Sequence, residues 1–287
     1  MARRRPLATF LLLAFGIGWP ALMVPALTGL PVEPFLLVLL FLALLGPALI
    51  VTRWADGPGA IRKLLGRTLI WRCGVARWAV VVLGMPILTL GLAALSGTIR
   101  SPEHGWPAEA GLYFFNTLVF GALVANLWEE TAWGGFVQTR LMASHGLLVG
   151  ALLTAPLFAA IHIPLQIGEG VPWSDFGIGV LVLFLAAPFY RYLLGMHLMD
   201  TGGSILVIAV QHASWNAAGN LESVEGGWQV VVAALVLTVL VAVVRRVRPG
   251  PGAPHGLEEE KAAAAGWLVP AVRSSGRTRS GRATPSA

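Results

Sequence analysis

Two adjacent acids, Glu129 and Glu130, lie inside an apolar stretch that reads NLWEETAWGGF over residues 126–136. Later apolar stretches contain two histidines, His162 and His212. Ionisable groups in membrane-type segments are costly to bury, and they usually mark functional sites. Carboxylates and imidazoles can deprotonate water and stabilise the charge that develops on an attacked carbonyl group. These four residues are therefore the first candidates for chemistry.

The surrounding composition indicates an integral membrane protein. Of the 287 residues, 56% are hydrophobic and only 12% are charged, with a mean hydropathy of +0.74. This is more apolar than a soluble domain. The one cysteine, Cys73, excludes an intrachain disulfide and a multi-cysteine metal site.

Eight apolar segments have lengths suited to membrane helices. We therefore predict an all-α polytopic membrane bundle of about eight spans, forming one domain over residues 1–248. Residues 249–287 lack a sustained apolar period, and we predict a disordered cytoplasmic tail without chemistry. The predicted spans are residues 6–27, 35–52, 77–97, 112–140, 146–165, 176–194, 204–219 and 228–244.

The arrangement of basic residues predicts the orientation. Lys and Arg favour the cytoplasmic side of short loops, and a cytoplasmic N-terminus places almost all of them there, with both termini inside. The net charge of +6 and the pI of about 10.4 then indicate contact with anionic lipid headgroups rather than with nucleic acid. Abundant Ala, Gly, Leu and Arg favour a bacterial cell membrane. The basic residues assigned to the inner face are Arg53, Arg62, Lys63, Arg67, Arg72, Arg77, Arg140, Arg191, Arg245, Arg246 and Arg248.

A shared site requires the candidates to lie at similar depth. If the fourth helix continues through Gly134 and Gly135 to about Leu141, Glu129 lies roughly 18 Å from its inner end. The same arithmetic places His162 at roughly 24 Å and His212 at roughly 14 Å. A helix that ended at residue 130 would instead leave the acids at the membrane surface, so the continuous helix is required.

Three segments resemble the ordered motifs of the CPBP family, intramembrane endopeptidases related to CAAX prenyl proteases and also called Abi proteins. The motifs are written EExxxR, FxxxH and HxxxN. The corresponding segments are residues 129–136, Phe158 to His162, and His212 to Asn216. The second and third match fully, and the similarity covers about residues 112–220.

The first motif departs from the family pattern, because Gly134 stands where the family usually carries an arginine. A carboxylate without a counterion in an apolar site tends to take up a proton. Glu130 is therefore either neutral, or paired with Arg140 or another basic group.

The resemblance implies a role for each site residue. Glu129 with His162 activates a water molecule, Glu130 completes the acidic pair, and His212 with Asn216 donates hydrogen bonds to the oxyanion. A second version makes Glu129, His162 and His212 ligands of a zinc ion whose bound water attacks. The sequence lacks a compact HExxH arrangement, and both versions stay open.

The resemblance therefore implies an intramembrane endopeptidase that acts on membrane-associated peptides or proteins. Two other classes stay open. A catalytically impaired immunity or scaffold protein fits the departure at Gly134, and a transporter fits because intramembrane Glu and His also mark ion pathways.

Overall fold

A computed structural model describes residues 4–168, 171–248, 254 and 256–268. Helices dominate this part of the chain, and one isolated antiparallel bridge joins Ile99 to Val224. Seven helices are long and apolar enough to cross a membrane, which confirms a polytopic helical bundle. They are Pro6–Thr28, Glu33–Asp56, Val75–Ser96, Trp106–His145, Leu147–Ile167, Trp173–Asp200 and Trp228–Val247.

The eighth predicted span is a shorter helix, α12 (Ile205–Gly219), of 15 residues. It covers only about 22 Å at 1.5 Å per residue, less than the ~30 Å hydrocarbon core. Most of its side chains are buried, and Ser204 caps its first turn by accepting a hydrogen bond from the Val207 amide. α12 is therefore an interior element of the bundle, surrounded by the longer helices.

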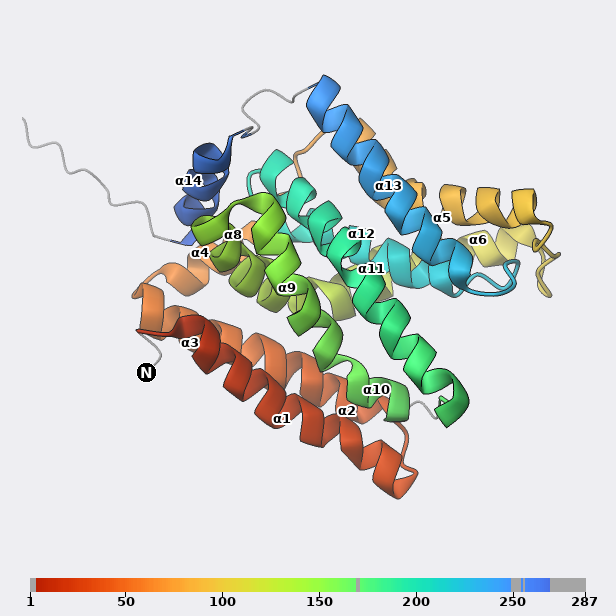
Figure 1. The fold of residues 1–287 in the computed structure, drawn as a ribbon, viewed down its shortest axis with the longest axis horizontal. Helices are drawn as coiled ribbons and strands as arrows, with labels where there is room; N and C mark the ends of the chain where they lie inside the picture. The colour runs from red at the N-terminus through yellow and green to blue at the C-terminus, as the bar shows by residue number, and fades with distance from the viewer. Residues whose placement is uncertain (1–3, 169–170, 249–253, 255, 269–287) are drawn as a thin grey trace, which may run out of the picture.

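Apart from α4 and η2, which lie between the second and third predicted spans, the remaining elements follow the predicted apolar segments. In Figure 1 the first helices, α1 to α3, flank one side of α9, whereas α5 and α13 lie on the opposite side of the bundle. Their bounds are α1 Pro6–Thr28, α2 Glu33–Leu37, η1 Val38–Leu45, α3 Gly46–Asp56, α4 Ala60–Gly66, η2 Arg67–Leu69, α5 Val75–Ser96, α9 Leu147–Ile161, α10 Ile163–Gly168, α11 Trp173–Asp200 and α13 Trp228–Val247.

The two acids lie on a long helix that changes its winding around them. It comprises α6 (Trp106–Phe115), η3 (Asn116–Asn126), α7 (Leu127–Glu130), η4 (Thr131–Gln138) and α8 (Thr139–His145) without interruption. The predicted continuation past Gly134 is confirmed. Both η3 and η4 are π-helical, a winding that often occurs at functional sites.

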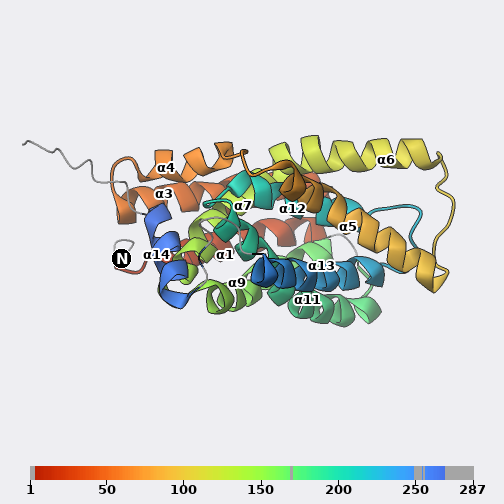
Figure 2. The same cartoon turned by 90° about the horizontal axis from the view of Figure 1, so that it is seen from above.

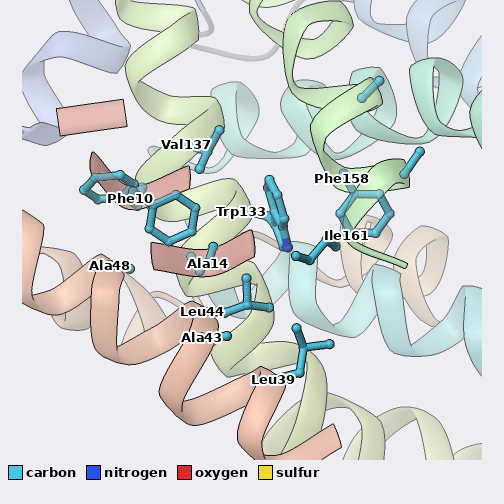
Figure 3. Packing of buried hydrophobic residues seen from close by; sticks show 14 of the residues in the cluster. Phe10, Ala14, Leu39, Ala43, Leu44, Ala48, Trp133, Val137, Phe158 and Ile161 are labelled. Atoms are coloured by element: carbon cyan, nitrogen blue, oxygen red, sulfur yellow. The ribbon is translucent and has the colours of Figure 1, made fainter. Parts of the chain in front are cut away.

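An aromatic core packs behind this helix and fixes its position. Trp133 is fully buried between the N-terminal helices and α9, as Figure 3 shows. Its ring meets Phe10 edge-on at 6.1 Å between centroids, and Phe158 at 5.8 Å. Such aromatic pairs add about 0.5–1.5 kcal/mol each beyond the area they bury. The contacts lock η4 against the helix that carries His162.

Three arginines expected at the lipid surface lie inside the protein, which corrects their assignment to a headgroup-facing patch. Arg191 is fully buried, and Arg67 and Arg140 are 4% and 7% exposed. Arg140 pairs with Asp56, and Arg67 donates to the carbonyls of Gly203 and Gly135. Buried charges need such partners, so these arginines connect elements inside the bundle.

The prediction of a disordered tail needs correction over α14 (Leu257–Leu268), which packs against α8 and α4. Glu260 accepts a hydrogen bond from the Leu147 amide at 2.8 Å, and the Trp267 ring lies 4.9 Å from the Arg67 guanidinium. Figures 1 and 2 both place α14 at the same end of the bundle as α4. The rest of that predicted tail, except residues 254 and 256, lies outside the described residues.

Candidate active site

Three separate elements bring the four ionisable candidates together. Glu129 and Glu130 lie on α7, His212 lies on α12, and His162 is the residue that ends α9. His162 Nε2 lies 3.5 Å from Glu129 Oε1, and His212 Nδ1 lies 2.9 Å from Glu130 Oε1. The convergence expected from depth along the helices is therefore present in the structure.

Glu129 lies on the accessible side of this cluster. Its side chain is 16% exposed, and that of His162 is 21% exposed. The Asn126 amide donates to Glu129 Oε2 at 3.4 Å, and His212 Nδ1 lies 4.0 Å from the same oxygen. The second oxygen, Oε1, faces His162. The carboxylate is thus fixed at one oxygen and directed toward an imidazole at the other.

The protonation of His162 follows from its hydrogen bond to the backbone. Its Nδ1 lies 2.7 Å from the carbonyl oxygen of Phe158, one turn earlier. A carbonyl only accepts, so Nδ1 is the donor of this bond and carries a proton. The other ring nitrogen, Nε2, faces Glu129 Oε1 at 3.5 Å. A water molecule beside them can form a hydrogen bond with each.

Glu130 lies on the closed side and is fully buried. Arg191 of α11 donates from Nη1 to both of its carboxylate oxygens, at 2.8 and 3.0 Å. The same guanidinium donates from Nε and Nη2 to Gln138 Oε1, at 2.9 and 2.5 Å. Gln138 in turn donates to the Arg191 carbonyl at 2.8 Å. A buried ion pair is stable only with such additional hydrogen bonds.

His212 joins the two sides of the cluster. Its Nδ1 donates to the paired carboxylate of Glu130, which leaves Nε2 for other partners. The ring is held edge-on by Phe158 and Tyr190, with centroid distances of 5.7 and 5.4 Å. Its orientation is therefore set by one hydrogen bond and two aromatic walls.

Asn216 differs from the other candidates. It lies one turn after His212 on α12, but its side chain is exposed, and it makes no hydrogen bond to the cluster among the described residues. The structure thus brings Glu129, Glu130, His162 and His212 together and leaves Asn216 on the adjoining turn.

The proposed zinc ligands do not form a metal-binding set in this arrangement. Within the described ranges, no three His, Cys, Asp or Glu side chains are placed so that they could hold one ion. The residues as placed do not fit a zinc ion, and no step below depends on one.

Three residues of the cluster were not among the sequence candidates: Arg191, Gln138 and Asn126. Arg191 carried the clearest signal, since it is an ionisable residue inside a predicted span. It was instead assigned to the cytoplasmic face, because that span was expected to end at residue 194. The helix α11 continues to Asp200, which leaves Arg191 about 13 Å from its end. Gln138 and Asn126 are uncharged and carried no such signal.

Comparison with known proteins agrees with this geometry. Residues 111–218 match the family model of the Rce1-like type II CAAX prenyl endopeptidases. No curated protein gives a match to the chain. The matched range contains all three motifs and agrees with the predicted core of residues 112–220. Residues 111–218 are therefore an Rce1-like domain of the CAAX prenyl endopeptidase type, within an integral membrane protein.

Proposed function

We propose that the protein is an intramembrane endopeptidase that hydrolyses membrane-associated peptides or proteins. The observation that carries this proposal is the close approach of Glu129 Oε1 and His162 Nε2, 3.5 Å apart, on side chains that are partly exposed. A water molecule hydrogen-bonded to both is polarised for deprotonation. The match to CAAX prenyl endopeptidases supports the same reaction class and makes prenylated C-terminal peptides one substrate class to test.

In the proposed reaction, Glu129 removes a proton from this water molecule as its oxygen bonds to the scissile carbonyl carbon. The carbonyl oxygen becomes an oxyanion, which needs hydrogen-bond donors. When the intermediate collapses, the carbon–nitrogen bond breaks and the proton returns to the leaving amine. Glu129 thus acts as base and then as acid, while His162 holds the water molecule beside it.

His212 and Asn216 are the proposed oxyanion donors. For His212 to donate from Nε2 as well as from Nδ1, its ring must carry both protons when the oxyanion forms. The exposed Asn216 amide, one turn away, is accessible to a bound substrate.

The test compares the purified, lipid-reconstituted protein with its Glu129→Gln variant. Both are incubated with a membrane peptide mixture and with a prenylated C-terminal peptide, and products are identified by mass spectrometry. Glu103→Gln is the matched control, since Glu103 is exposed in a loop. Cleavage that persists unchanged in Glu129→Gln would overturn the proposal.

The two rival classes predict different results. A transporter requires Glu129-dependent flux into sealed vesicles without a peptide product. An immunity or scaffold protein requires a cellular phenotype that the Glu129→Gln substitution leaves intact, again without a product.

A further inference from the structure

The Arg191 side chain touches residues of the first two motifs and reaches the third through Glu130. It forms the ion pair with Glu130, and its guanidinium carbon lies 5.2 Å from the Phe158 ring centroid. Glu130 in turn accepts from His212. A planar guanidinium suits this position, because it can donate to a carboxylate and an amide in one plane while a ring covers its face.

The backbone around Arg191 is shaped to admit this side chain. A Cβ atom at Gly134 would lie 2.9 Å from Glu130 Oε2, 2.3 Å from Ile208 Cδ1 and 3.7 Å from Arg191 Nη2. Any side chain at position 134 would therefore enter the space in which Arg191 meets Glu130. A Cβ at Gly195 would lie 2.7 Å from Gln138 Nε2, so this second glycine admits the amide that clamps the arginine.

The alternative cation, Arg140, does not serve Glu130. It pairs with Asp56 and lies with its guanidinium 3.7 Å from the Phe136 ring centroid, toward α3. Among the described residues, the ion pairs of Glu130 are those with Arg191 and His212. Loss of Arg191 would therefore leave a fully buried carboxylate with only an imidazole beside it.

We infer that Arg191 is the positioning residue of the site, entering from α11 beside Gly134 to hold the Glu130 carboxylate, which in turn orients His212. The cation that the EExxxR pattern carries on the same helix as the acids is supplied here by a different helix. The catalytic consequence rests on the proposed function, whereas the effect on Glu130 does not.

The first experiment measures protonation and requires no substrate. Infrared spectroscopy of the reconstituted protein detects the carbonyl stretch of a protonated carboxylic acid. Arg191→Gln is expected to gain such a band, because the fully buried Glu130 carboxylate then keeps only His212 of its two partners among the described residues, and taking up a proton removes the cost of burying its charge. The band should vanish when Glu130→Gln is added. The control, Arg245→Gln, should give no band, since Asp200 keeps Arg77 as its partner.

The second experiment measures cleavage per folded molecule. Arg191→Gln is expected to lower kcat about a hundredfold with KM changed less than about threefold, because an orienting group is lost and substrate contacts are kept. A triple variant, Gly134→Arg/Arg191→Gln/Ile208→Val, moves the arginine to position 134 and removes the Cδ1 atom that would clash with it. Compared with Arg191→Gln, this variant is expected to lose the infrared band and to have a kcat at least about tenfold higher. This variant also tests the inference if Arg191→Gln does not fold.

The outcomes separate this inference from the proposed function. A Glu130 that stays ionised in Arg191→Gln, or a kcat within about threefold of the unmodified protein, overturns the role of Arg191. Failure of the relocated arginine to remove the band does so too. If the unmodified protein cleaves nothing, the proposed function fails, and the infrared result still decides whether Arg191 holds Glu130.

Discussion

The two neighbouring glutamates occupy opposite halves of one site. Glu130 belongs to a closed half with Arg191, Gln138 and His212, where its side chain is fully buried and both oxygens accept hydrogen bonds. Glu129 belongs to an open half with His162, where the side chains are 16% and 21% exposed and Glu129 Oε1 faces His162 Nε2 at 3.5 Å. The same residue type thus serves as a fixed anion in one half and as a candidate base in the other.

The largest expected effect is on cleavage through the open half. Glu129→Gln and His162→Gln are each expected to lower kcat by about 10²- to 10⁴-fold, the usual contribution of a general base. Both side chains are partly exposed, so the folded protein should keep its stability within about 1 kcal/mol. Turnover and unfolding measured on the same preparations check this. A large loss of stability in either variant would erase the distinction between the halves.

The next effect is on stability through the closed half. Glu130→Ala leaves the buried Arg191 without its counterion, which is expected to cost about 3–5 kcal/mol of unfolding free energy. Glu129→Ala should cost much less. Unfolding in mixed micelles with increasing sodium dodecyl sulfate, followed by near-ultraviolet circular dichroism, compares the two. Equal losses would show that Glu130 is not the structural member of the pair.

A smaller effect is expected at Gln138. Gln138→Leu removes the amide that accepts from Arg191 and leaves buried donors unsatisfied, which is expected to cost about 1–3 kcal/mol. Cleavage should fall only a few-fold, because the Glu130 ion pair remains. Gln166→Leu on α10 is a comparison, since it removes a Gln whose Oε1 has no hydrogen-bond partner within the described part of the chain. If Gln138→Leu lowers the unfolding free energy no more than Gln166→Leu does, the hydrogen bonds between Gln138 and Arg191 do not stabilise the protein.

The smallest effect is expected from metal removal. Among the described residues, no three His, Cys, Asp or Glu side chains are placed so that they could hold one ion. Cleavage should therefore change less than about twofold after dialysis against a strong chelator. If the chelator abolished cleavage and added zinc restored it, His212 would have to act together with Glu129 and His162. That result would contradict the division of the site into a closed half and an open half.

Much of the fold could be predicted from hydropathy, whereas part of the site could not. All eight apolar segments are helical, and the acids, His162 and His212 were found because ionisable groups in apolar segments are rare. Arg191 was missed because the charge pattern of loops was applied to a residue inside α11. A sequence shows position along a helix but does not show which neighbouring helix a long side chain reaches.

The helix α14 was missed for a different reason. Its segment is rich in Ala, Glu and Leu, which favour helix, and acids occupy its first turn. The preceding Pro- and Gly-rich residues and the short length made the whole tail look disordered. Its stability comes from packing on α8 and α4, which local sequence does not reveal.

The central claim is that Glu129 and His162 hold the attacking water molecule while Glu130 does not. A high-resolution experimental structure of the protein in a lipid nanodisc tests this most directly. The prediction is an ordered water molecule within hydrogen-bond distance of both Glu129 Oε1 and His162 Nε2, with Glu130 dry and paired to Arg191. Side chains of Glu129 and His162 that face different helices, or water bound to Glu130 instead, would contradict it.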